Sequence, residues 1–162
     1  MSEEAVIGPD EFKRVLGHFA SGVTVVTSVI DGVPAGMTIQ SFTSVSLDPP
    51  LVGFLPSRDS SSWLAMKESG SFCVNILGSA QEDLCMTMAS RAEDKFDGVD
   101  WVAGPTGSPV FPGSIGWIDC TIEAVHEAGD HDIVVGRVVH LEAVEDGADP
   151  LLFFKGGFGA FS

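Results

Sequence analysis

The sequence predicts a mainly β protein, an antiparallel barrel with a few short helices. Short segments rich in Val, Ile and Phe recur along the chain and are separated by turns rich in Gly, Asp and Pro, as in strands joined by hairpins. The strands do not alternate regularly with helices, which argues against a doubly wound parallel sheet. With 162 residues, 44% of them hydrophobic, the chain fits a single domain over 1–162, whose core we expect at about 10–160.

Each expected element follows from a local signal. Pro9 and two acidic residues precede apolar side chains at helical spacing, and serines mark the start of a second helix near residue 60. Asp31-Gly32 follows a β-branched run and is a hairpin signal. In order, we expect a helix over 8–19, strands over 23–30, 34–46 and 51–56, a helix over 60–69, a strand over 71–77, a helix over 79–90, a long loop over 91–113, strands over 114–128 and 132–145, and a last strand within 150–162.

The chain is strongly acidic, with 8 basic and 23 acidic residues and a formal net charge of −15. Eight scattered cations do not form the groove that a nucleic acid needs, and the charge also disfavours an anionic membrane surface. No apolar run approaches the roughly 18–20 residues of a membrane span, and the N-terminus does not resemble a signal peptide. Cys73, Cys85 and Cys120 form no close pair, which favours reduced thiols over a disulfide or metal site. We therefore expect a cytoplasmic protein with no nucleic-acid, membrane or metal partner.

The expected strand within GMTIQSFTSVSLDPP (36–50) is unusually polar for so hydrophobic a chain. Such a strand is either an edge strand whose hydroxyls face water or a surface that hydrogen-bonds a polar ligand. Its hydroxyl and amide side chains are Thr38, Gln40, Ser41, Thr43, Ser44 and Ser46.

The segment SRDSSSW (57–63) brings serines and one of the few cations, Arg58, to the expected start of a helix. Free backbone N–H groups and the helix dipole favour an anion at such a position, so phosphate binding is one interpretation. The other is plain N-capping of the helix by Ser60 or Ser61. The sequence leaves both open.

Familiar catalytic patterns are missing: the chain has no G-x-G-x-x-G after a strand, P-loop, H-E-x-x-H or G-x-S-x-G. His131 lies at the tip of the longest expected hairpin, without the partners that a metal site requires. Lys95 and Phe96 fit a solvated turn that buries one aromatic ring, and Phe158 fits a C-terminal core position. None of these residues indicates a function by itself.

Eight segments, in order, resemble the flavin reductase-like domain family, the short-chain NAD(P)H:flavin oxidoreductases that partner two-component flavin monooxygenases. The resemblance covers roughly residues 10–160. The segments are FASGVTVVTS (19–28), GMTIQSFTSVSLDPPLV (36–52), SSSW (60–63), SGSFCVNIL (69–77), DKFDG (94–98), GSP (107–109), GDHDIVVGRV (129–138) and PLLFFKGGF (150–158).

The resemblance implies an FMN-binding split barrel, usually a homodimer, with the flavin near the subunit interface. Arg58 and Lys95 are then the cations expected to face the flavin phosphate, and His131 and Phe158 the residues expected at the nicotinamide. Gln40 stands where many relatives carry Asn, and Phe158 where relatives often carry Tyr. The implied flavin-binding residues are Thr38, Ile39, Gln40, Ser41, Phe42, Ser44, Val45, Ser46, Ser57, Arg58, Ser61, Ser62, Trp63, Lys95 and Phe96.

The implied activity is hydride transfer from NADH or NADPH to FMN or FAD, which supplies reduced flavin to a partner monooxygenase. The cofactors carry this chemistry, so no catalytic side chain or metal is required. The sequence does not distinguish FMN from FAD. It weakly favours NADH over NADPH, because no cation is obviously placed for a 2′-phosphate. Two alternatives remain: a flavoprotein electron carrier that holds FMN tightly without using NAD(P)H, and a small-ligand-binding barrel without a redox role.

Overall fold

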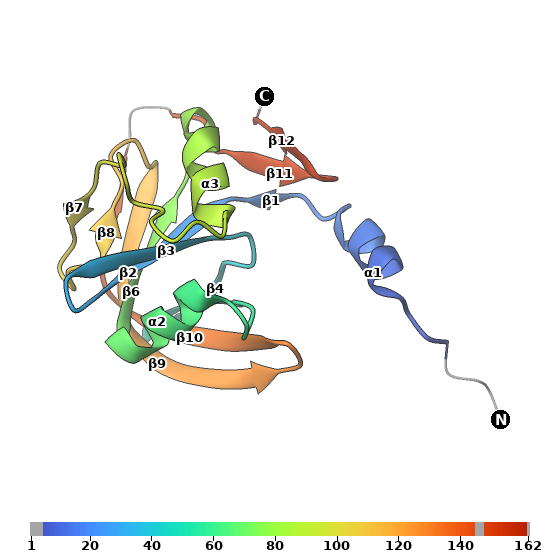
Figure 1. The fold of residues 1–162 in the computed structure, drawn as a ribbon, viewed down its shortest axis with the longest axis horizontal. Coiled ribbons are helices and arrows are strands. Elements are labelled where there is room, and N and C mark those ends of the chain that lie inside the picture. The colour runs from blue at the N-terminus through green and yellow to red at the C-terminus, as the bar shows by residue number, and fades with distance from the viewer. Residues whose placement is uncertain (1–4, 145–147, 162) are drawn as a thin grey trace.

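A computed structural model describes residues 5–144 and 148–161. Its centre is a seven-stranded antiparallel sheet with the order β3-β2-β6-β9-β10-β5-β4 (Figure 1). Strands β3 and β4 follow one another in the chain but occupy opposite edges of the sheet, so the barrel stays split between them. The strands are β2 (Thr24–Ile30), β3 (Val33–Ile39), β4 (Thr43–Leu47), β5 (Pro50–Phe54), β6 (Ser71–Ile76), β9 (Gly116–Ala128) and β10 (His131–Ala143).

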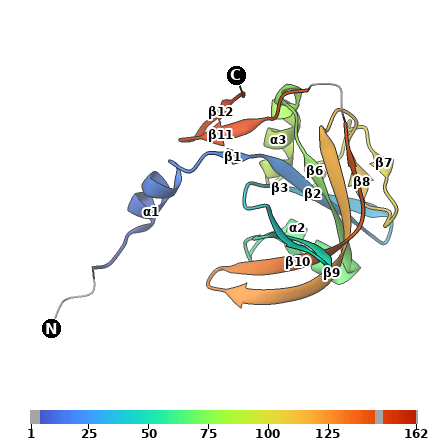
Figure 2. The ribbon, with the colours of Figure 1, turned by 180° about the vertical axis from the view of Figure 1, so that it is seen from behind.

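Helix α2 packs on β2 and β3, and α3 lies on the same two strands. Helix α1 projects from the body of the molecule in both views (Figures 1 and 2). A small sheet of β1, β11 and β12 and a short ribbon of β7 and β8 complete the fold. Their bounds are α1 (Pro9–Leu16), α2 (Ser61–Ser69), the 3-10 turn η1 (Ser79–Gln81), α3 (Glu82–Ala89), β1 (Ser21–Gly22), β7 (Val102–Ala103), β8 (Pro109–Val110), β11 (Leu152–Phe154) and β12 (Gly157–Gly159).

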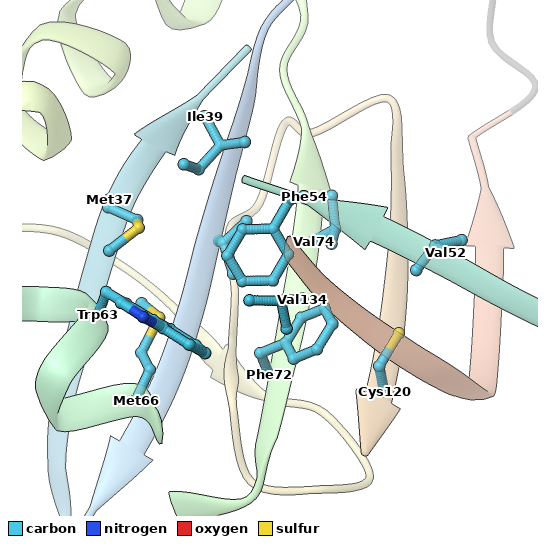
Figure 3. Close-up of a cluster of buried hydrophobic side chains, with 11 residues drawn as sticks. Met37, Ile39, Val52, Phe54, Trp63, Met66, Phe72, Val74, Cys120 and Val134 are labelled. Carbon is cyan, nitrogen blue, oxygen red and sulfur yellow. The ribbon is translucent and has the colours of Figure 1, made fainter. Parts of the chain in front are cut away.

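Two apolar clusters cover the two faces of β2. Val26 lies in one cluster and Val25 in the other, because successive side chains of a strand point to opposite faces. In the first cluster Trp63 from α2 packs edge-on against Phe54, with a distance of 5.9 Å between ring centroids (Figure 3). The second cluster contains Met88 from α3. Both helices are therefore fixed to the sheet by burial of apolar surface.

The structure corrects the prediction of one strand over 34–46. The chain leaves the sheet at residues 40–42 and crosses from the edge formed by β3 to the opposite edge formed by β4. Ser41 supports this crossing, because its Oγ accepts a hydrogen bond from the Leu55 backbone N–H (3.0 Å) and donates to the Leu55 carbonyl (3.2 Å). One hydroxyl thus replaces a missing strand partner at the end of β5.

Elsewhere the expected elements match those observed to within a few residues at their ends, with three exceptions. Strand β1 was not expected, and the single strand expected within 150–162 is the pair β11 and β12. The third exception is the expected loop 91–113. That stretch contains the paired strands β7 and β8, each two residues long. Among the described residues, no helix is long and apolar enough to cross a membrane.

Candidate functional site

A cavity of about 800 Å³ lies beside β3, between the start of α2 and the segment 91–98. Residues from three separate parts of the chain line it: Gly36 of β3, Ser61 and Ser62 of α2, and Lys95 and Phe96. The four polar and aromatic residues among these belong to the flavin-binding set that the sequence predicts. The fold therefore brings them together although more than thirty positions of sequence separate Ser62 from Lys95.

Lys95 joins three elements at the wall of this cavity. Its Nζ donates hydrogen bonds to the Met88 carbonyl (2.8 Å), the Gly36 carbonyl (3.0 Å) and the Ser62 Oγ (3.3 Å). Burial lowers the pKa of Lys95, because desolvation disfavours the charged ammonium. None of the three acceptors carries a charge, and among the described residues no carboxylate forms an ion pair with Lys95. Glu93, Asp94 and Asp97 also line the cavity, but none of them is paired with the Lys95 ammonium.

The start of α2 faces the same cavity with two serines that do not cap the helix. The N-cap is Ser60, whose Oγ accepts a hydrogen bond from the Trp63 backbone N–H (3.2 Å). Ser61 and Ser62 are left to line the cavity, where the positive end of the helix dipole favours an anion. N-capping therefore applies to Ser60, and phosphate binding by Ser61 and Ser62 stays a prediction.

Gly36 and Phe96 shape the wall behind Lys95. A Cβ on Gly36 would come within 2.9 Å of the Met88 Sδ and 3.1 Å of the Phe96 ring, so a larger residue here would displace these two side chains. The Phe96 ring is itself held by stacking on Phe111, with 5.9 Å between centroids, and by an edge contact with Trp101. The wall is therefore preformed by packing.

The polar segment 38–46 divides into internal and exposed side chains. Thr38 donates from Oγ1 to the Cys85 carbonyl (2.6 Å), and Ser41 bonds Leu55 as described above. Ile39 is buried in the core, and Phe42 packs against it. The side chains that make none of these contacts, all of them exposed or half-exposed, are Gln40, Thr43, Ser44, Val45 and Ser46.

Two members of the predicted flavin-binding set lie elsewhere, in a group that we call the hairpin-tip cluster: Arg58, Trp63, Lys67, Glu127 and Asp132. Arg58 donates from its terminal nitrogen to Glu127 Oε1 (3.0 Å), and its Nε lies 3.6 Å from Asp132 Oδ1. The fully buried Trp63 donates from Nε1 to Asp132 Oδ2 (2.8 Å). The side chains of Arg58 and Trp63 thus contact acidic residues of β9 and β10, and this arrangement gives no support to their predicted contact with the flavin.

The two residues predicted at the nicotinamide are not brought together within one chain. His131 begins β10, at the hairpin tip, and its Nδ1 lies 2.7 Å from Asp130 Oδ1. The hydrogen bond with His131 lowers the pKa of Asp130. Phe158 lies on β12, where its ring packs against Phe153 at 5.4 Å between centroids. In Figures 1 and 2 β12 and the tip of the β9–β10 hairpin lie at different ends of the molecule.

Sequence reasoning missed three contributors to these sites. Gly36 and the Met88 carbonyl hold Lys95, and Asp132 holds Arg58 and Trp63. The position of Asp132 next to His131 was a signal that could have identified it. The carbonyl of Met88 could not be identified from the sequence, because every residue has a backbone carbonyl.

Comparison with known proteins decides the family. The model of the flavin reductase like domain matches residues 16–162. The chain belongs to this family. It is 47% identical over 152 residues to the flavin-dependent monooxygenase reductase subunit HsaB of Rhodococcus jostii, covering 94% of this chain and 77% of the relative. It is also 47% identical over 159 residues to a flavin reductase of Pseudomonas putida, covering 98% and 93%.

Solved structures of flavin reductase-like domains share the fold. The nitrilotriacetate monooxygenase component B homologue of Mycobacterium thermoresistibile superposes with a TM-score of 0.92 at 46% identity, covering 94% of this chain and 86% of that one. The Streptomyces globisporus NADH:FAD oxidoreductase SgcE6, in complex with NAD and FAD fragments, has a TM-score of 0.90 at 36% identity, covering 98% and 97%. The predicted family, the mainly β split-barrel fold and the flavin oxidoreductase activity with flavin and a nicotinamide are confirmed.

Proposed function

We propose that this flavin reductase-like domain uses NADH to reduce FMN or FAD and supplies the reduced flavin to a separate monooxygenase, and that it works as a homodimer. The observation that carries the site assignment is the cavity that joins Ser61, Ser62, Lys95 and Phe96. The relatives named as monooxygenase reductase subunits support the partner.

The residues at the cavity fit the phosphate end of a flavin. Lys95 supplies a charge that is paired with no carboxylate among the described residues, and the start of α2 supplies the helix dipole and the hydroxyls of Ser61 and Ser62. Ser62 already accepts a hydrogen bond from Lys95, so its own O–H is available to donate to a phosphate oxygen. The volume of about 800 Å³ is in the range of cofactor pockets, roughly 300–1,000 Å³.

The rest of the flavin follows the polar segment beyond β3. In this proposal the exposed side chains of Gln40, Ser44 and Ser46 hydrogen-bond the ribityl chain and the ring, and Val45 contacts the ring. Thr38, Ile39, Ser41 and Phe42 take part through their backbone groups, because their side chains serve the fold. Ser57, also in the predicted flavin-binding set, lies at the hairpin tip, where it forms an isolated β-bridge with His131.

When bound, the nicotinamide and the flavin would supply the chemistry, which is hydride transfer from the first to the second. The chain itself binds and orients them, and Lys95 keeps a positive charge beside the phosphate. His131 would bind the nicotinamide at the hairpin tip, and Phe158 would cover it. No side chain has to move a proton in this scheme.

A homodimer would account for two further observations. Strand β12, which carries Phe158, and the tip of the β9–β10 hairpin, where β10 begins at His131, lie at different ends of the molecule, so a site that uses both would need a second copy. Helix α1 is amphipathic but buries none of its residues, and Leu47 on β4 is 97% exposed. The exposed apolar side chains Phe12, Val15 and Leu16 of α1 form the kind of contiguous patch that often marks an interaction surface.

The proposed activity is tested by anaerobic oxidation of NADH with excess FMN and then FAD, against a control without protein. We expect rapid loss of NADH absorbance, and the ratio of the two rates ranks FMN against FAD. If the flavin binds but neither NADH nor NADPH reduces it, the reductase assignment is wrong and the electron-carrier alternative replaces it.

The shared nicotinamide site is tested by mixing two variants, His131→Ala and Phe158→Ala, under conditions that allow subunit exchange. Each variant alone should have a raised KM for NADH. A site built from both copies predicts that mixed dimers recover one intact site and part of the parental activity. A mixture no better than its components, or a monomeric parent in light scattering, would contradict the composite site.

A further inference from the structure

Asp132 is a buried acidic residue that the proposed hydride transfer does not use. It is 3% exposed. Its Oδ2 accepts the hydrogen bond from Trp63 Nε1 and lies 3.9 Å from Lys67 Nζ. Its Oδ1 is buried without a hydrogen-bond donor among the described residues, and lies 3.6 Å from Arg58 Nε. A buried carboxylate is costly to retain, so its presence calls for an explanation.

The backbone around Asp132 joins the hairpin tip to the segment that precedes α2. The Asp132 N–H donates to the Pro56 carbonyl (3.0 Å), and the Arg58 N–H donates to the Asp130 carbonyl (3.0 Å). Between these two hydrogen bonds lies the isolated bridge of Ser57 with His131. His131 is thus the central residue of a short contact between the two segments.

The side chains of the hairpin-tip cluster reinforce this contact from both strands of the hairpin. Asp132 on β10 and Glu127 on β9 are direct partners in the strand register, and both acidic side chains face Arg58. Trp63 holds Asp132 from the opposite side, as part of α2. The carboxylate of Asp132 therefore links the hairpin tip with both α2 and the segment before it.

A neighbouring hollow of about 310 Å³ does not explain Asp132 as a ligand-binding group. Arg58, Lys67 and Asp132 line it, but Oδ1 of Asp132 is itself inaccessible to solvent. A molecule in the hollow would meet Arg58, Lys67 and the carboxylates of Asp59 and Asp130, and not this oxygen. The contacts of Asp132 are internal, which favours a role in holding other residues in place.

We propose that Asp132 is a positioning residue: by holding Arg58 and Trp63, it fixes the hairpin tip and with it the orientation of His131. This inference rests on the proposed role of His131 at the nicotinamide. The proposed role affects binding of NADH and not of flavin. The hairpin tip carries His131, whereas Lys95, Ser61 and Ser62 line the separate cavity that would take the flavin phosphate.

The test is an Asp132→Asn variant, which can keep an oxygen acceptor for Trp63 while it removes the negative charge that faces Arg58. We expect the KM for NADH to rise roughly tenfold with little change in kcat, as small displacements of a positioning group can cause. The Kd for FMN, from flavin fluorescence, should stay within about twofold of the parent. An unchanged KM for NADH, or a Kd for FMN that moves as much as the KM, would overturn the proposal.

Glu123→Gln is the matched control. It removes a carboxylate that accepts two hydrogen bonds from Arg137 on the same hairpin, but further from the tip. The KM for NADH should not change in this variant. If it rises as in Asp132→Asn, general loosening of the hairpin explains the effect and the specific role of Asp132 is wrong.

A double variant shows whether Asp132 acts through His131. In the His131→Ala background, Asp132→Asn should raise the KM for NADH no further, whereas an independent effect would add to the first and contradict the proposal. If His131→Ala leaves the KM unchanged, the nicotinamide assignment fails and this inference fails with it. If His131→Ala raises the KM but Asp132→Asn does not, the positioning role alone is wrong.

If Asp132→Asn fails to fold, Arg58→Gln tests the same contact by changing the partner of Asp132. Arg58 is 44% exposed, so this change is tolerated more easily. We expect it to raise the KM for NADH in the same direction, again with the Kd for FMN unchanged. An unchanged KM for NADH in Arg58→Gln would overturn the proposal.

Discussion

The cavity beside β3 and the hairpin-tip cluster each contain a basic side chain that the sequence assigns to the flavin phosphate. Lys95 at the cavity is held by two backbone carbonyls and a serine hydroxyl, all uncharged. Arg58 in the hairpin-tip cluster is paired with the carboxylates of Glu127 and Asp132. In a chain with a net charge of −15, the partners of a cation therefore decide whether it can attract an anion.

This difference makes Lys95→Met the change with the largest expected effect on flavin binding. The variant loses a positive charge at the cavity that no carboxylate among the described residues pairs with, and hydrogen bonds to charged groups are worth about 1.5–3 kcal/mol. We expect the Kd for FMN, measured by fluorescence, to rise roughly 10- to 100-fold.

Arg58→Met is the matched comparison, because it removes a cation of similar length whose charge is already paired. Its Kd for FMN should stay within about twofold of the parent. Similar losses of affinity in the two variants would mean that both cations face the phosphate, and that Arg58 leaves its carboxylate partners when flavin binds.

The serines at the start of α2 give a second comparison, in which we expect a smaller change in FMN affinity. Ser61→Ala combined with Ser62→Ala should weaken FMN binding by about 1–3 kcal/mol, because the phosphate loses two hydroxyl donors. Ser60→Ala removes the N-cap and should lower the free energy of unfolding by about 1 kcal/mol, measured in urea, with little change in Kd. If Ser60→Ala weakens FMN binding as much as the double variant, the serines act only through helix stability.

The strands of the sheet were predictable because their signals are local. The β-branched run before Asp31-Gly32 and the two long strands around Gly129 match β2, β9 and β10 to within a few residues. The break at residues 40–42 could not be predicted in this way, because it arises from the pairing of distant strands. Five other strands lie between β3 and β4 in the sheet. That separation depends on long-range pairing, which no local pattern in GMTIQSFTSVSL reveals.

The candidate site shows the same limit at the level of side chains. Ser61, Ser62, Lys95 and Phe96 were named from the resemblance, and the fold brings them to one cavity. The pairing of Arg58 with Glu127 was not predictable, because Glu127 lies 69 positions further along the chain, on strand β9. The partners of Lys95 include two backbone carbonyls, which leave no trace in a sequence.

The smallest expected effect is a pH dependence of FMN affinity that follows the pKa of Lys95, and it tests the contrast between Lys95 and Arg58 most directly. Burial lowers this pKa in the free protein, and a bound phosphate would favour the charged form. Affinity for FMN should therefore be full below the pKa of Lys95 in the free protein and fall as the pH rises through it. The other charged side chains that line the cavity are carboxylates and the guanidinium of Arg91, classes that keep their charge from about pH 7 to 10.

Two controls isolate Lys95 in this titration. Lys95→Arg keeps a positive charge across the range, so its affinity for FMN should lose the alkaline fall that the parent shows. Riboflavin lacks the phosphate but has the same ring, so any change in its affinity reports ionisation of the ring or of other groups. If the parent binds FMN and riboflavin with the same pH dependence, Lys95 does not face the phosphate, and the contrast with Arg58 has no consequence for flavin binding.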